Sequence, residues 1–195
     1  MDTILFDAEP DFKSKVFKAA FAALKEADIE GDKEIRAVIT IYTKTKDVAT
    51  RNACLKLLYN KNSAVLKTFF ADAYKKERSL DMKLYALRGL AQFVAEDEIA
   101  ERLVKFNETL KERAHTAPYN YQEYEFLLGQ NAFPYLLKKY GYGCLKESLE
   151  ILQNQYNAMP DAFKGHFTID ENGQTVFLRR PEESTKMMAD FFRSG

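Results

Sequence analysis

Small and large apolar residues recur every 33 positions along this chain, and this period constrains its fold more than any other feature. The recurring residues are Ala20, Ala53 and Ala86, followed four positions later by Leu24, Leu57 and Leu90. Residues four apart share one face of a helix, so each Ala-Leu pair predicts one helix face. Because alanine is small, a neighbouring helix can come close to that face at the alanine. Units that cannot bury an apolar face alone stack on one another, which predicts a row of repeated helical hairpins.

Helical spacing of apolar residues runs from about residue 11 to residue 113. The expected inward face of the first helix consists of Val16, Ala20, Phe21 and Leu24. Asp47 precedes one later segment and Asn62-Ser63 precedes another, where we expect them to cap helices. The acidic run Glu96-Asp97-Glu98 opens another helix and faces the positive end of its dipole. A carboxylate metal site is the alternative interpretation of that run.

One of the repeated segments carries a recognisable pattern. Asp81 precedes Met82-Lys83-Leu84-Tyr85-Ala86-Leu87-Arg88-Gly89-Leu90, which resembles the second helix of a HEAT repeat: an Asp in the turn, an apolar-basic pair, then Ala and Leu. Residues 47–57 and 16–24 match more loosely. The resemblance covers residues 11–114 and implies a curved stack whose second helices line a concave face. An irregular helical bundle is the alternative.

The 33-residue period fails after Arg113. Adding 33 to Ala86 and to Leu90 reaches Tyr119 and Glu123, which do not match the repeat. Residues 115–118 are typical of a linker. We then predict helices over residues 120–128 and 131–140, a third helix that buries Leu145 and later leucines, and a closing helix that begins near Pro181.

Residues 166–178 have the alternating pattern of a β-hairpin. Asn172-Gly173 is a strong two-residue turn signal. This turn would pair Ile169 with Val176 and Phe167 with Leu178, on one apolar face. Such a hairpin is marginal alone, so we expect it to pack on the helices.

These patterns predict an all-α fold: a short HEAT-like α-α solenoid with a C-terminal helical extension and one small β-hairpin. Residues 1–114 hold the helical hairpins and residues 115–195 hold the extension. We expect the two parts to form one continuous structural domain. A chain of 195 residues is long enough to bury a core without a staple.

Composition limits the compartment and the class of partner. Lys plus Arg and Asp plus Glu both number 29, so the formal charge of zero gives no long-range attraction to nucleic acid or anionic lipid. The acidic N-terminus lacks the pattern of a signal peptide, and no segment is long and apolar enough to span a membrane. We therefore expect a cytoplasmic protein. Cys54 and Cys144 are interpreted as reduced structural thiols, with a disulfide or a reactive thiol as alternatives.

No catalytic or metal-binding constellation stands out, and no cofactor is predicted. The two histidines, His115 and His166, have no partner at metal-ligand spacing. Gly141 and Gly143 precede a helix, and anion binding by its first backbone amides is one interpretation of them, but the phosphate-loop spacings are missing. Gly141 is better interpreted as the C-cap of the preceding helix.

Two surfaces are candidates for recognition. Tyr119, Tyr121 and Tyr124 form a cluster, and tyrosine offers a large contact area at a small entropic cost. They pack on the last repeat in the alternative interpretation. The basic candidates for the concave face are Lys18, Arg51, Lys83 and Arg88, which in the alternative are simply solvated.

We therefore expect a non-enzymatic protein-interaction module, a scaffold or adaptor that binds another protein through its concave face and tyrosine-rich edge. One alternative is a HEAT-type DNA-binding or alkylated-DNA repair protein, although the chain has no Trp and no net positive charge. Another is an immunity or inhibitor protein that neutralises one toxin or enzyme.

Overall fold

The computed structural model describes residues 14–112, 132–158, 167–169 and 175–177, with Lys186, Asp190 and Arg193. Helices dominate this part, and the fold class is all-α, as predicted. The helices are α2 (Lys15–Ala23), η1 (Glu26–Asp28), α3 (Asp32–Lys44), α4 (Val48–Leu58), α5 (Ala64–Lys76), α6 (Leu80–Leu90), α7 (Glu96–Lys111), α9 (Ala132–Tyr140) and α10 (Tyr142–Ala158). The linker at 115–118, the helix expected at 120–128 and most of the closing helix lie outside the described residues.

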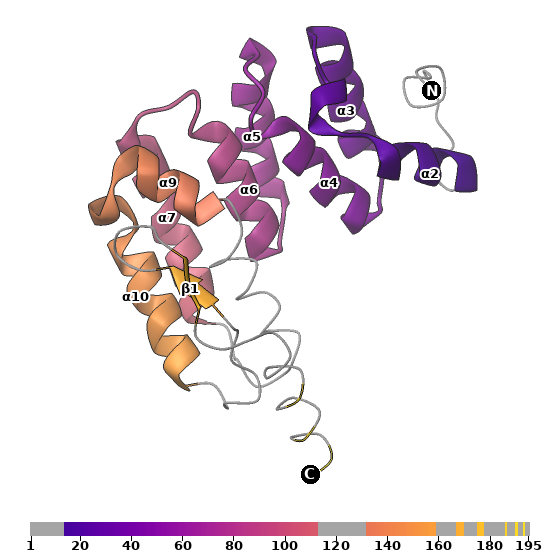
Figure 1. Ribbon diagram of the computed structural model, residues 1–195. Coiled ribbons are helices and arrows are strands. Elements are labelled where there is room, and N and C mark those ends of the chain that lie inside the picture. Colours follow the sequence, from indigo (N-terminus) through magenta and orange to yellow (C-terminus); the bar gives the residue numbers. More distant parts are fainter. Residues whose placement is uncertain are drawn as a thin grey trace.

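The helices follow one another in a row of pairs, from α2 at one end to α10 at the other (Figure 1). Helix α3 packs on α4 and α5 packs on α6, while α4, α6 and α9 lie side by side. Helices α2, α4 and α6 begin at residues 15, 48 and 80, and helices α3, α5 and α7 begin at residues 32, 64 and 96. A pair of helices therefore recurs every 32 or 33 residues, in agreement with the period in the sequence.

The expected caps stand at the helix ends. Asp47 accepts a hydrogen bond from the backbone N–H of Thr50 in the first turn of α4. The three acidic residues predicted at the start of α7 form its first turn. Gly141 has a φ of +82°, and its N–H donates to the carbonyl of Leu137, which ends α9 in the left-handed conformation that glycine adopts without strain.

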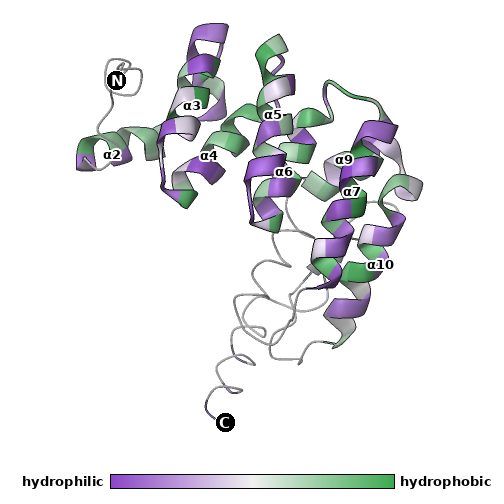
Figure 2. Cartoon of the chain, turned by 180° about the vertical axis from the view of Figure 1, so that it is seen from behind, coloured by the Kyte–Doolittle hydropathy of each residue, from purple (hydrophilic) through white to green (hydrophobic). Residues whose placement is uncertain are grey.

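The core is centred on α6. Nine of its eleven residues are buried, from Leu80 to Leu90, because α4, α5, α7 and α9 all pack against it. Other helices carry hydrophobic and hydrophilic residues in alternation, as Figure 2 shows, and bury one side only. None of the described helices is both long enough and apolar enough to cross a membrane.

The inward face of the first repeats differs from the prediction. Val16 is 60% exposed, and Phe17 is buried in its place and stacks on Phe21. Ala20 and Ala53 are only half-buried. The residue after each alanine is the buried one in all three repeats: Phe21, Cys54 and Leu87. Helix α6 has neighbours on more sides than α2 or α4, which explains why Ala86 alone of the three alanines is fully buried.

A polar network joins the last two long helices. The Ser148 hydroxyl of α10 donates to the Asn107 side chain of α7 at 2.6 Å, and both residues are buried. The Asn107 amide donates to Glu147, which also accepts from Lys111 at 2.7 Å. Buried polar groups that are all satisfied fix one relative placement of two helices, so α10 is held in register on α7.

Strands β1 (Phe167–Ile169) and β2 (Thr175–Phe177) pair antiparallel. Their register differs from the prediction by one residue, since Ile169 pairs with Thr175 and not with Val176. A two-residue Asn-Gly turn requires an even number of residues between paired positions, whereas this register leaves an odd number. The predicted partnership of Ile169 and Val176 on one face is therefore wrong.

Gly89 provides the first test of this packing. A Cβ atom at position 89 would lie 2.3 Å from the ring of Phe70, which is fully buried. Alanine has the higher helix propensity, yet the clash dominates, so we expect Gly89→Ala to lower the free energy of unfolding by about 1–3 kcal/mol. Chemical denaturation measures the change. The double variant Gly89→Ala/Phe70→Leu should lose less than the sum of the two single losses, and strict additivity would contradict the close contact.

The two free cysteines provide the second test. Burial raises the pKa of Cys54 to about 12, and that of the half-buried Cys144 is raised as well. The thiolate is the reactive form, so in the native protein at mildly alkaline pH an alkylating reagent should modify Cys144 at least about tenfold faster than Cys54. Mass spectrometry of the labelled peptides measures both rates. Under denaturing conditions the rates should become similar, and equal rates in the native protein would show that Cys54 is accessible.

Candidate functional site: a groove between α3 and α5

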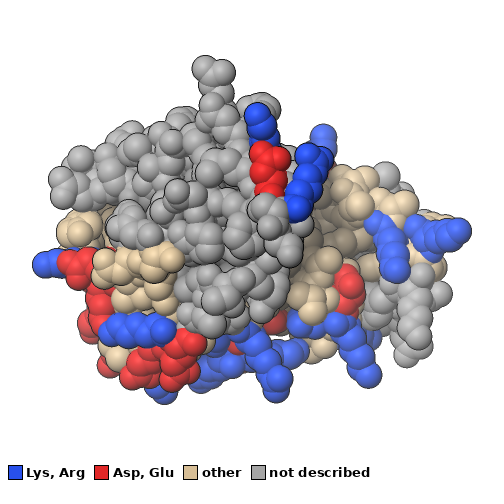
Figure 3. Space-filling view, turned by 90° about the horizontal axis from the view of Figure 1, so that it is seen from below, with Lys and Arg blue, Asp and Glu red and all other residues tan. Residues whose placement is uncertain are grey.

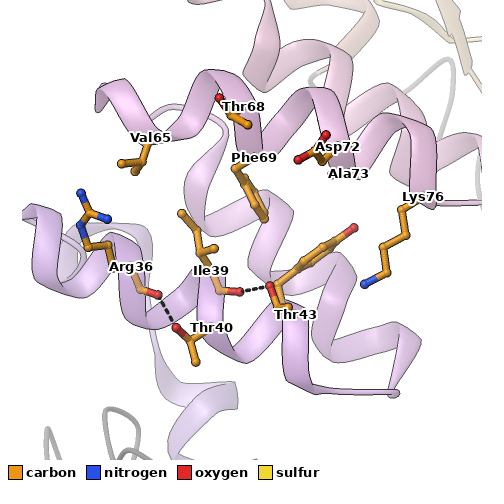
Figure 4. Close-up of a pocket in the computed structure, with 11 residues that line it drawn as sticks. Arg36, Ile39, Thr40, Thr43, Val65, Thr68, Phe69, Asp72, Ala73 and Lys76 are labelled. Atoms are coloured by element: carbon orange, nitrogen blue, oxygen red, sulfur yellow. Dashed lines mark hydrogen bonds between the residues drawn. The ribbon is translucent and has the colours of Figure 1, made fainter.

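The strongest candidate site is a groove between α3 and α5, the first helices of two successive pairs. Its volume is about 650 Å³. The lining residues are Arg36, Ile39, Thr40, Tyr42 and Thr43 from α3, and Val65, Thr68, Phe69, Asp72, Ala73 and Lys76 from α5. The two helices run alongside each other with these side chains between them (Figure 4).

Apolar side chains form the floor of the groove. Phe69 meets the ring of Tyr42 edge to face, with 5.1 Å between centroids. Ile39 and Val65 are half-buried on either side, so part of their surface remains open to an occupant. Edge-to-face is a preferred arrangement of aromatic rings, so this pair joins α3 to α5 across the floor.

Polar groups form the rim on the α3 side. The hydroxyls of Thr40 and Thr43 donate to the carbonyls of Arg36 and Ile39 on their own helix, at 2.9 and 2.8 Å (Figure 4). A hydroxyl has one proton and two lone pairs. These threonines therefore offer hydrogen-bond acceptors, and not donors, to a molecule in the groove.

A buried network closes the groove at the end of α5. The Tyr42 hydroxyl donates to Oε1 of Glu77 at 2.5 Å, and Nε of Arg51 in α4 donates to the same oxygen at 3.0 Å. Glu77 is buried and is the C-cap residue of α5. Burial and the adjacent Glu77 carboxylate raise the pKa of Tyr42, so its phenol remains protonated and donates.

A second contact joins the N-terminal ends of the same helices. Ser63 stands at the N-cap of α5, as predicted, but its hydroxyl donates to the Asp32 carboxylate of α3 at 2.7 Å. The groove is thus tied at both ends by side-chain hydrogen bonds between its walls. Its width is set before anything binds.

The groove carries a cation at each end. Arg36 lies near Val65, and Lys76 lies at the opposite end of α5 (Figure 4). Within the described residues Arg36 forms no ion pair, and Nζ of Lys76 lies 5.4 Å from the Tyr42 ring centroid. Asp72 is the one carboxylate among the lining residues. The lining therefore has a net positive charge.

The basic residues predicted for the concave face lie in different environments. Lys18 is exposed on α2. The Arg51 side chain is 17% exposed and is engaged with Glu77. Nζ of Lys83 donates to the Tyr74 carbonyl at 2.6 Å, and burial lowers its pKa. The predicted tyrosines, Tyr119, Tyr121 and Tyr124, lie outside the described residues.

Arg88 is a correction, because it is interior and does not project from a surface. It is only 8% exposed, and its guanidinium lies between the rings of Tyr59 and Tyr135, at 3.9 and 4.8 Å from their centroids. It also donates to the Asn60 side chain at 2.7 Å. Helix α9 brings Tyr135 against α6, and the local HEAT-like pattern holds no information about that contact.

The described surface does not present one continuous basic strip on the face seen in Figure 3. Lys and Arg side chains are interspersed there with Asp and Glu. Among the residues with described positions, no three His, Cys, Asp or Glu side chains gather closely enough to hold a metal ion.

Comparisons with protein-family models, with curated proteins and with solved structures find no match.

Sequence analysis missed the groove. Ile39, Tyr42 and Phe69 are apolar residues within the helically spaced region of residues 11–113, and two of these three are buried. No local pattern marks the space that remains between α3 and α5. The only available signal was the breadth of the α3 apolar stripe, from Ile35 to Tyr42, which includes the half-buried Ile39.

Tyr42→Phe tests the closing network. The variant removes one hydrogen bond to a buried carboxylate, so we expect the free energy of unfolding to fall by about 1.5–3 kcal/mol. A double-mutant cycle with Glu77→Gln should give a coupling energy of about 0.5–3 kcal/mol. Thr40→Val on the exposed rim is the control and should change stability by about 0.5 kcal/mol or less. A Tyr42→Phe loss as small as the control's would mean that the network does not hold the groove.

Proposed function

We propose that this chain is a non-enzymatic protein-interaction module, a scaffold or adaptor, and that the groove between α3 and α5 is a docking site for a partner protein. The observation that carries the proposal is a groove with an apolar floor and polar rims whose width is fixed by hydrogen bonds at both ends.

The scaffold in this proposal is a HEAT-like stack. Three successive pairs begin 32 or 33 residues apart, and equivalent helices α4 and α6 pack side by side. Repeats of this kind contact mainly their neighbours and create extended surfaces between successive units. Because such a fold can serve many functions, the function is assigned from the groove and not from the repeats.

The chemistry of the groove resembles that of protein interfaces. Their centres are apolar and aromatic, and their rims are polar. Phe69 and Ile39 supply the first, while Thr40, Thr43 and Asp72 supply the second. A groove that exists before binding avoids part of the entropic cost of ordering an interface, which favours docking of a short segment.

Nucleic acid is the less favoured partner. The chain has no net charge, and the described residues on the face seen in Figure 3 include both Lys or Arg and Asp or Glu. Phosphate binding needs several cations that act together. Asp72 inside the groove and the acceptor oxygens of Thr40 and Thr43 would oppose a phosphate backbone.

Lys18 and the tyrosines at 119, 121 and 124 stay in the proposal as further contacts. Lys18 is exposed at the far end of the row from α10. A tyrosine-rich edge would add contact area at a small entropic cost.

Blocking the groove tests the proposal. Thr68→Trp places a large ring in the groove from an exposed helical position, and Val104→Trp places the same ring on the exposed surface of α7 as a control. Quantitative affinity capture from lysate of the native source should recover a partner with the unmodified chain and with Val104→Trp. We expect recovery to fall at least about tenfold with Thr68→Trp, while the thermal unfolding midpoints of both variants stay close. Equal recovery by all three proteins would contradict docking in this groove.

A further inference from the structure

We infer that the occupant of the groove is a short extended segment of another protein with apolar residues between two carboxylates. This inference rests on the proposed function and adds the chemistry of the partner. It follows from the length of the groove, its hydrogen-bonding groups and the charges at its ends.

The length of the groove follows from α5. Val65 and Lys76 are eleven residues apart on one helix, and a rise of about 1.5 Å per residue separates them by about 16 Å. An extended chain advances about 3.3 Å per residue, so about six residues span this distance. The groove therefore accepts a segment of about six residues.

The floor of the groove suits an extended segment. Alternate side chains of such a segment point to one side, so they can lie together on the floor formed by Ile39, Val65 and Phe69.

The hydrogen-bonding groups agree with an extended segment. Thr40 and Thr43 present acceptor lone pairs, because their protons are used on α3. An extended backbone has N–H groups that need acceptors, whereas a helix has satisfied most of its own. The α3 rim thus offers what an incoming strand lacks.

The charges at the ends of the groove indicate which residues stand at the ends of the partner segment. Arg36 and Lys76 stand at opposite ends of the groove, and neither forms an ion pair within the described part of the chain. A carboxylate at each end of the partner segment complements both cations. Asp72, near Lys76, disfavours a third carboxylate inside the segment.

Selection from a displayed library of random heptapeptides tests this inference on the full chain. Peptides enriched by the unmodified protein should carry Asp or Glu near both ends and apolar residues between them. The double variant Arg36→Glu/Lys76→Glu should enrich peptides with basic ends. Lys105→Glu/Lys138→Glu, which reverses two exposed charges that do not line the groove, is the matched control and should keep the acidic preference.

Affinities of a synthetic peptide, Glu-Ser-Leu-Ser-Leu-Ser-Glu, give the quantitative test by fluorescence anisotropy. Arg36→Glu/Lys76→Glu should weaken its binding about tenfold or more, and Asp72→Asn should strengthen it about two- to threefold. Added salt should weaken binding to the unmodified chain more than to the double variant. Equal binding of a peptide with lysine at both ends would overturn the inference.

Other outcomes separate the inference from the proposed function. The selection could enrich peptides that lack acidic ends and that the Thr68→Trp variant does not bind. This result would overturn the inference that the partner segment has acidic ends, but it would still support docking in the groove. Failure to enrich any peptide would overturn the inference, while the capture experiment judges the proposed function independently. Light scattering could show that the unmodified chain is a dimer and that the Thr68→Trp variant is a monomer. This result would mean that a second copy of the chain occupies the groove, and it would overturn the inference of a different partner protein.

The chain itself contains a sequence of this composition, Asp2-Thr3-Ile4-Leu5-Phe6-Asp7, with carboxylates five positions apart. The full-length variant Ile4→Ser/Phe6→Ser distinguishes it from an external partner. We expect this variant to bind the synthetic peptide with the affinity of the unmodified chain. Binding at least about fivefold tighter would mean that the chain's own segment competes for the groove, and would overturn the assignment to another protein.

Discussion

The structure depends on the close packing of α6 against its neighbours on several sides. Gly89 lets the ring of Phe70 on α5 come nearer than any side chain at that position would permit. Arg88 brings a charge into the same interior, where the rings of Tyr59 and Tyr135 face its guanidinium. A buried guanidinium is costly unless groups that stabilise its charge are held beside it. Because the first of these rings follows α4 and the second belongs to α9, Arg88 of α6 favours one placement of both helices.

The repeating part of the fold was predictable because its information is local. Apolar spacing, Asp47 as a cap and Gly141 at a helix end all report on a few neighbouring residues. The rest depends on contacts between distant segments. Adding one period to Ala86 reaches Tyr119, whereas α9, one of the helices that pack against α6, begins thirteen residues later, at Ala132. The hairpin register failed for a similar reason, since turn preference alone did not determine it.

The groove was less predictable than the helices that form it. Arg51 resembles a solvent-exposed cation in the sequence, but Glu77, 26 residues later, draws it into an ion pair beneath Tyr42. Whether such partners meet depends on how closely α3, α4 and α5 approach, and no single helix encodes that distance. The same holds for Ser63, whose position as a cap was correct and whose hydrogen bond to Asp32 was not foreseen.

The carboxylate of Glu77 has a consequence for how this protein can evolve. It receives the hydroxyl of Tyr42 from α3 and the guanidinium of Arg51 from α4, and it ends α5. Loss of any one member leaves the others buried with incomplete partners. These three positions should therefore be inherited together or exchanged together, so that divergent copies of the chain vary there in concert while the exposed rim changes freely.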